Sequence, residues 1–112
     1  MFEFSVRTVK LIEKLPERIS VSEYGRQLIR SSGSIGANLE EADGALTKKD
    51  FINKVGISRR EARESRHWVK LLKAIVPIHN TSIKNELDWS IKECNEILLI
   101  LSSIIKKSQA NS

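Results

Sequence analysis

Four glutamates and the two histidines are the residues of this 112-residue sequence best suited to acid–base or metal chemistry. The glutamates are Glu40, Glu41, Glu61 and Glu64. A di-metal centre in a helical bundle needs a Glu-x-x-His pair on each of two helices. Only Glu64 and His67 have this spacing, because Val76 stands three residues before His79. The sequence therefore predicts neither a metal site nor a catalytic site.

Cys94 and a serine-rich segment are the other features that could carry chemistry. Cys94 is the only cysteine, so it cannot form an intramolecular disulfide, and no basic neighbour would lower its pKa. The segment RSSGSIG at residues 30–36 has the composition of a phosphate-binding loop, but it lacks the Gly-Lys-Ser/Thr sequence and a preceding strand. We interpret Cys94 as a core residue and the segment as close helix packing, and we expect no cofactor.

Glu61 and Glu64 are placed on the apolar half of their predicted helix by its periodicity. An unpaired carboxylate would be costly there, so both residues require partners. Arg26, Arg30 and Asn38 on the preceding helix are the candidates. The sequence thus predicts a buried polar network that fixes the register of two helices.

Basic residues are concentrated in one third of the chain. Residues 46–80 carry nine basic and three acidic side chains, whereas residues 1–45 carry six and seven and residues 81–112 carry four of each. At about 100° per residue, five of these cations lie within an arc of about 80° on one helix. This basic stripe consists of Arg59, Arg63, Arg66, Lys70 and Lys73.

The basic stripe has two interpretations. It is the solvated face of an amphipathic helix, or it binds an anionic partner such as the phosphates of structured RNA. Few acids alternate with the cations, which favours a partner. No aromatic RNA-reading motif accompanies the stripe, so a contact would depend on backbone charge and shape and not on base identity.

Periodicity and start and stop signals predict four helices that would position these side chains. In the first, Phe2, Val6, Val9 and Ile12 recur at helical spacing before Pro16. Ser22 and Thr47 are N-cap candidates for the second and third helices, Thr81 or Ser82 begins the fourth, and Gly44 and Pro77 are stop signals. The expected helices cover residues 2–15, 22–44, 48–76 and 82–107.

Short loops between long helices favour antiparallel neighbours. The sequence therefore predicts an all-α, antiparallel up-down-up-down four-helix bundle that forms one domain over residues 1–112. No run of about 18 to 20 apolar residues is present, and the N-terminus lacks a signal-peptide pattern. We expect a cytoplasmic protein without a membrane segment.

The fourth predicted helix is more apolar than one core seam requires. Its seam consists of Ile83, Leu87, Ile91, Cys94, Leu98, Leu101 and Ile105. Ile97, Leu99, Ile100 and Ile104 add apolar surface on other sides. This surplus indicates either an interface between copies of the chain or a wide core seam with some tolerated exposure.

Three segments resemble the bacterial four-helix-bundle family named after the 23S ribosomal RNA intervening-sequence protein. They are residues 30–42, 48–51 and 57–64, and the similarity covers almost the whole chain. The positions that match the family pattern are Arg30, Ser34, Ile35, Asn38, Glu41, Ser58 and Glu64. Ala42 stands where many members have glycine.

The resemblance implies a homopentamer without enzymatic activity, in which Arg30, Asn38, Glu41 and Glu64 are structural polar positions. A related accessory protein of retroelements resembles a pentameric barrel whose basic surface engages nucleic acid. Two functions follow as expectations. The first is a nucleic-acid-associated module that uses the basic stripe. The second is a structural or adaptor oligomer that binds another protein.

Overall fold

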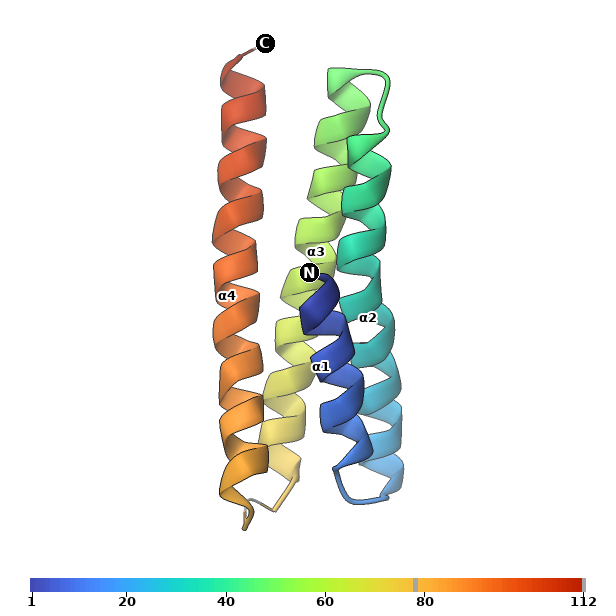
Figure 1. Cartoon of the computed structure of the whole chain (residues 1–112), viewed down its shortest axis with the longest axis vertical. Coiled ribbons are helices and arrows are strands. Elements are labelled where there is room, and N and C mark those ends of the chain that lie inside the picture. Colours follow the sequence, from blue (N-terminus) through green and yellow to red (C-terminus); the bar gives the residue numbers. More distant parts are fainter. Residues whose placement is uncertain (78, 112) are drawn as a thin grey trace.

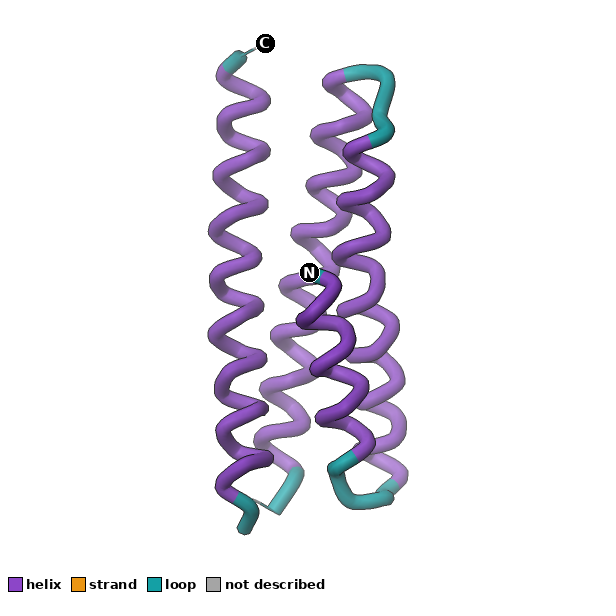
Figure 2. Tube along the Cα trace, viewed as in Figure 1, coloured by secondary structure: helices purple, strands orange, loops and turns teal. Residues whose placement is uncertain are grey.

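The structure is a computed structural model that describes residues 1–77 and 79–111, and every regular element in these residues is an α-helix. The helices are α1 (Phe2–Glu13), α2 (Ile19–Asp43), α3 (Lys48–Ile75) and α4 (Thr81–Ala110). They run alternately up and down along a rod of 51 × 19 × 19 Å and are joined by short loops (Figures 1 and 2). The predicted all-α antiparallel bundle is confirmed. None of the helices described is both long and apolar enough to cross a membrane.

Capping residues explain two of the helix starts. Thr47 caps α3 as predicted, because its hydroxyl oxygen accepts a hydrogen bond from the Asp50 backbone N–H at 3.1 Å. Asn80 caps α4 by accepting from the N–H groups of Ser82 and Ile83. The prediction that Ser22 caps α2 is wrong. α2 begins at Ile19, and the Ser22 N–H already bonds the Arg18 carbonyl oxygen at 2.9 Å.

The helix ends differ from the predicted ends by one to three residues. α1 stops at Glu13, two residues early, because the residue before Pro16 is disfavoured in a helix. α3 stops at Ile75, and Val76 is extended before Pro77 for the same reason. α4 continues through Ala110, three residues beyond the predicted end at residue 107.

Removal of the Thr47 cap should destabilise the protein measurably. We expect Thr47→Ala to lower the free energy of unfolding by about 1 kcal/mol, because one N–H at the start of α3 loses its acceptor. Thr47→Ser keeps the hydroxyl and should lose much less. Chemical denaturation of the two variants measures the difference, and equal losses would contradict the capping role.

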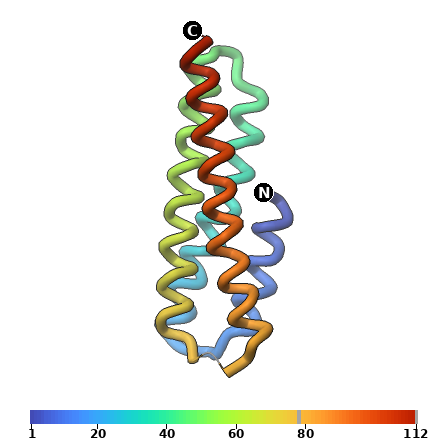
Figure 3. The backbone as a smooth tube through the Cα atoms, turned by 90° about the vertical axis from the view of Figure 1, so that its left-hand side faces the viewer, coloured from blue at the N-terminus to red at the C-terminus, as the bar shows by residue number. Residues whose placement is uncertain are grey.

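The bundle changes its cross-section along its length, because α1 is much shorter than the other helices. α1 packs on α2 and α4, and α3 packs on α2 and α4, whereas the α2 and α4 backbones make no close contact within the described residues. A Cβ atom at Gly36 would lie 3.9 Å from Met1 Cβ, so the N-terminal end of α1 lies at the level of Gly36. Beyond that level only α2, α3 and α4 continue (Figures 1 and 3). We call the two parts the four-helix half and the three-helix half.

The core consists of two clusters along the rod. The cluster in the four-helix half includes Leu28, Leu72 and Leu87. Ile35 and Leu101 belong to the second cluster, which continues into the three-helix half. All five side chains are fully buried. The core seam predicted for α4 is largely confirmed, since Ile83 and Ile91 are partly buried and its other members are buried.

The buried side of α1 is not the one that its apolar spacing predicts. Phe4, Thr8 and Leu11 face the core. Thr8 can be buried because its hydroxyl donates to the Phe4 carbonyl oxygen at 2.8 Å. The apolar spacing predicted that Phe2, Val6 and Val9 face the core. Their exposed fractions are instead 83, 37 and 38 %.

Small side chains hold α2 close to its neighbours. The hydroxyls of Ser31 and Ser65 hydrogen-bond at 2.8 Å, and Ser58 donates to the Ile35 carbonyl oxygen at 2.8 Å. All three serines are buried. The segment RSSGSIG is therefore helical, and it serves packing between α2 and α3, as its composition predicts.

Candidate functional site

The basic stripe lies on α3 beside α4. Arg63 and Lys70 are exposed, whereas Arg59, Arg66 and Lys73 are half-buried. The sequence predicted that the stripe faces solvent or a partner. Arg59, Arg66 and Lys73 are only half exposed, because each of them also reaches a polar side chain of α4.

The contacts between the stripe and α4 repeat every seven residues. Arg59 Nη1 donates to Ser102 Oγ at 3.4 Å, and Arg66 Nη1 donates to Asn95 Oδ1 at 2.8 Å. Lys73 Nζ lies 2.6 Å from a carboxylate oxygen of Asp88. The numbers rise by seven on α3 and fall by seven on α4, as expected for two antiparallel helices. The contacts hold three cations in one line over a length of about 21 Å.

Only one end of this line is neutralised by an acid. Asp88 binds both Lys73 and Lys84, and these hydrogen bonds lower the pKa of its carboxyl below the ordinary value. The partners of Arg59 and Arg66 are uncharged. Arg63 and Lys70 have no partner among the described residues. The positive charge of the stripe is therefore greatest between Arg59 and Lys70.

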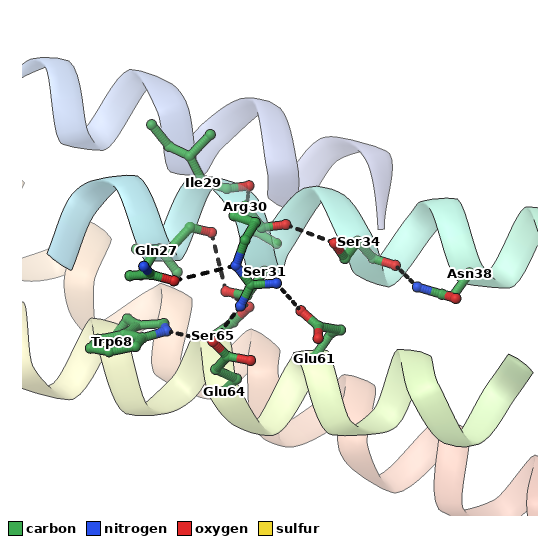
Figure 4. Close-up of polar contacts among 12 residues, drawn as sticks. Gln27, Ile29, Arg30, Ser31, Ser34, Asn38, Glu61, Glu64, Ser65 and Trp68 are labelled. Carbon is green, nitrogen blue, oxygen red and sulfur yellow. Dashed lines mark hydrogen bonds and ion pairs between the residues drawn. The ribbon is translucent and has the colours of Figure 1, made fainter. Parts of the chain in front are cut away.

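The acids of α3 do not reduce this charge, because they are engaged elsewhere. Apart from Asp50 in its first turn, α3 contains only the carboxylates Glu61 and Glu64. Arg30 of α2 bonds both: Nη1 donates to Glu61 Oε2 at 3.1 Å and Nη2 donates to Glu64 Oε1 (Figure 4). One guanidinium thus holds the two acids on the α2 side of α3.

The structure brings together Arg30 and Glu64 of the predicted polar network and adds two residues. Arg30 Nε donates to Gln27 Oε1 at 3.3 Å, and Trp68 Nε1 donates to Glu64 Oε1 at 3.2 Å (Figure 4). Partial burial alone would raise the pKa of Glu64, but the bonds from Arg30 and Trp68 outweigh it and the pKa is lowered. The bond to Glu64 raises the pKa of Arg30.

Three residues proposed for the network are outside it. Asn38 donates to the Ser34 carbonyl oxygen of its own helix at 2.9 Å (Figure 4). Glu41 is exposed near the end of α2, beyond the reach of the α3 carboxylates. Arg26 pairs with Glu23 on the surface. Residue type alone identified these side chains as polar candidates, whereas the register of α2 against α3 decides which side chains meet.

Five partner residues of the site were not predicted, although their spacing in the sequence marks them. Asp88, Asn95 and Ser102 are polar at seven-residue spacing, which marks one line on α4. Gln27 and Trp68 stand three residues before Arg30 and four residues after Glu64, so each shares a helix face with its partner.

The remaining candidates for chemistry are packing residues. Burial raises the pKa of the Cys94 thiol to about 12, so the thiol is protonated and poorly nucleophilic at neutral pH. No group of three or more metal-ligating side chains occurs in residues 1–77 and 79–111. Tyr24 and Trp68 stack with ring centroids 5.6 Å apart against the core of the four-helix half.

Comparison with known proteins assigns the chain to a family. The family described as 23S rRNA-intervening sequence protein matches residues 1–103. A crystal structure from Bacteroides thetaiotaomicron, described as a protein with unknown function from the S23 ribosomal protein family, is 35 % identical in sequence. Their superposition covers 94 % of each chain with a TM-score of 0.78. No curated protein matches the chain. Together, the family match over residues 1–103 and the similar crystal structure show that this chain belongs to the 23S rRNA-intervening sequence protein family.

Proposed function

We propose that this protein is a non-enzymatic, cytoplasmic homo-oligomer that associates with structured RNA through the basic stripe of α3. The observation that carries the proposal is the line of cations from Arg59 to Lys70, which no carboxylate neutralises within the described residues. Such a surface suits the phosphate backbone, where affinity arises largely from counterion release. A pentamer, which the family resemblance implies, would repeat this surface and gain affinity by avidity.

Gel retardation of a structured RNA tests the proposal. The wild-type protein should retard the RNA at about 50 mM salt, because counterion release favours binding most at low salt. Arg63→Glu with Lys70→Glu should weaken binding about tenfold or more, since each change replaces an attraction to phosphate by a repulsion. Both residues are exposed and without partners in the described part of the chain, so helicity should not change.

A matched control separates the stripe from net charge. Lys10→Glu with Lys14→Glu makes the same change in charge at two exposed positions, one in α1 and one at its C-cap, and α1 does not contact α3 in the described structure. This control should bind RNA nearly as well as the wild type. Absence of wild-type retardation at about 50 mM salt would overturn the RNA proposal.

A second candidate, an adaptor oligomer that binds another protein, is favoured by an apolar patch away from the stripe. Phe2 is 83 % exposed, and Val6 and Val9 are partly exposed on α1. Ile29, 41 % exposed, points from α2 toward α1 and away from Arg30 (Figure 4). Apolar side chains gathered on one surface are typical of protein interfaces. If the wild-type protein does not bind RNA, this patch becomes the surface to test by mutation.

A further inference from the structure

The three-helix half of the bundle has a groove where a fourth helix would lie. The N-terminal end of α1 lies near Gly36, and α2 continues past it to Asp43. A pocket of about 860 Å³ lies next to the N-terminal end of α1. It is lined by Met1 and Phe2 of the N-terminus and, on α2, by residues that include Gly36, Leu39, Glu40 and Asp43.

Helical periodicity places one side of α4 across from this groove. In the four-helix half, Glu86 and Trp89 of α4 face α1, because Arg7 bonds Glu86 at 2.5 Å and lies over the Trp89 ring. By helical periodicity the same side of α4 continues through Ile100 and Ile104 beyond the end of α1. Ile100 is 52 % exposed and Ile104 is partly buried against the core. Beyond α1, the side of α4 that α1 covers in the other half of the bundle thus carries Ile100 and Ile104 together with the exposed charges of Glu96 and Lys107.

The α2 side of the groove is acidic. Glu40 and Asp43 are exposed, and neither forms an ion pair within the described residues. Leu39 lies beside them and packs partly against the core. An occupant that matches this groove has an apolar ridge flanked by basic side chains.

The outer side of α4 has such a ridge. Lys92, Leu99 and Lys106 follow one another at seven-residue spacing, so they lie along one line of the helix. Leu99 is 73 % exposed, and both lysines are exposed and without an ion pair in the described chain. The ridge has the charge and the apolar character that the groove requires.

We infer that the ridge of one copy docks in the groove of the next copy, with Leu99 against Leu39 and Ile104 and with the ridge lysines facing Glu40 and Asp43. The inference rests on the oligomer of the proposed function and identifies its contact surfaces. Ridge and groove are different faces of one chain, so the contact is head-to-tail. Repeated around an axis, a contact of this kind closes into a ring and does not form a two-fold dimer.

Charge reversal on each side, followed by restoration, tests the docking. Glu40→Lys with Asp43→Lys should reduce the mass measured by light scattering to that of the 12.7 kDa chain. Lys92→Glu with Lys106→Glu should do the same, because both doubles place like charges across the contact. The quadruple variant, which carries all four changes, restores opposite charges and should restore the oligomer.

A control double, Glu13→Lys with Glu17→Lys, makes the same charge change near the α1–α2 turn and should leave the oligomer intact. Circular dichroism checks that every variant remains helical. A monomeric wild type would overturn the oligomer of the proposed function and this docking with it. A wild-type oligomer that persists in either double, or a quadruple variant that stays monomeric, would overturn only the docking. The stripe of α3 is unchanged in all of these variants, so RNA retardation that is weaker in a monomeric variant reports the loss of avidity and not the loss of the stripe.

Discussion

Leu28→Ala should lower the free energy of unfolding by about 2 to 5 kcal/mol, among the largest effects of any single substitution in this chain. Leu28 is fully buried in the cluster of the four-helix half, where α2 packs against α3. Truncation removes three carbon atoms and leaves a cavity that rigid neighbouring helices cannot fill. Urea denaturation of the variant and the wild type measures the loss.

Leu46→Ala is the matched control for this substitution. Leu46 is 99 % exposed in the loop between α2 and α3, so the same atoms are removed without a cavity. The free energy of unfolding should change by less than about 0.5 kcal/mol. Similar losses at the two positions would contradict the assignment of Leu28 to the core.

Arg30→Ala should lower the free energy of unfolding by about 1 to 2 kcal/mol at neutral pH, because it leaves Glu61 and Glu64 without their shared partner. A fully buried pair would lose more. The side chain of Arg30 is 48 % exposed, and water screens part of the interaction. Arg26→Ala removes an arginine from the same helix that pairs with Glu23 at the surface, and it should change stability by less than about 0.5 kcal/mol.

The destabilisation caused by Arg30→Ala should become smaller as the pH falls. The pKa of Glu64 is lower in the folded protein than in the unfolded chain. The ion pair therefore stabilises the fold at pH values above the pKa that Glu64 has in the unfolded chain. This stabilisation is lost as the pH falls through the lowered pKa, when the carboxylate is protonated. Thermal melts of wild type and variant should therefore differ at pH 7 and converge below about pH 4. A difference that is constant from pH 7 to pH 3 would contradict the role of the ion pair.

The sequence was sufficient to predict the four helices and their antiparallel order, because proline, glycine and capping residues mark most of the boundaries. It failed at the start of α2, where Ser22 offered a better cap than Arg18 but Ile19 already begins the helix. Val21 in this first turn is buried in the core cluster of the four-helix half, and a local capping preference does not reflect such tertiary packing.

The orientation of α1 could not be predicted, because two stripes compete on it. Phe2, Val6 and Val9 are more apolar in sequence than Phe4, Thr8 and Leu11. In the second set Phe4 and Leu11 fill the core, and Thr8 can be buried with them because its hydroxyl bonds the Phe4 carbonyl oxygen. Burial of a polar side chain depends on its hydrogen-bond partner, which periodicity does not reveal.

The candidate site was predicted in part. The pattern identified the cations of α3 and the need of Glu64 for a basic partner. It did not distinguish Arg30 from Arg26 and Asn38, since that choice depends on how α2 and α3 are registered along their axes. Nor did it show that Arg66 bonds Asn95, because the rotation of α4 about its axis is set by the whole core.

The dependence of RNA affinity on salt tests the central claim most directly. If the stripe of one protomer neutralises about four or five phosphates, the logarithm of affinity should fall by roughly 3 to 4 for each tenfold rise in salt. In the Arg63→Glu and Lys70→Glu double variant the slope should be smaller by about 1.5, because two phosphate contacts are lost. An affinity that does not change with salt, or equal slopes for the two proteins, would contradict binding through the stripe.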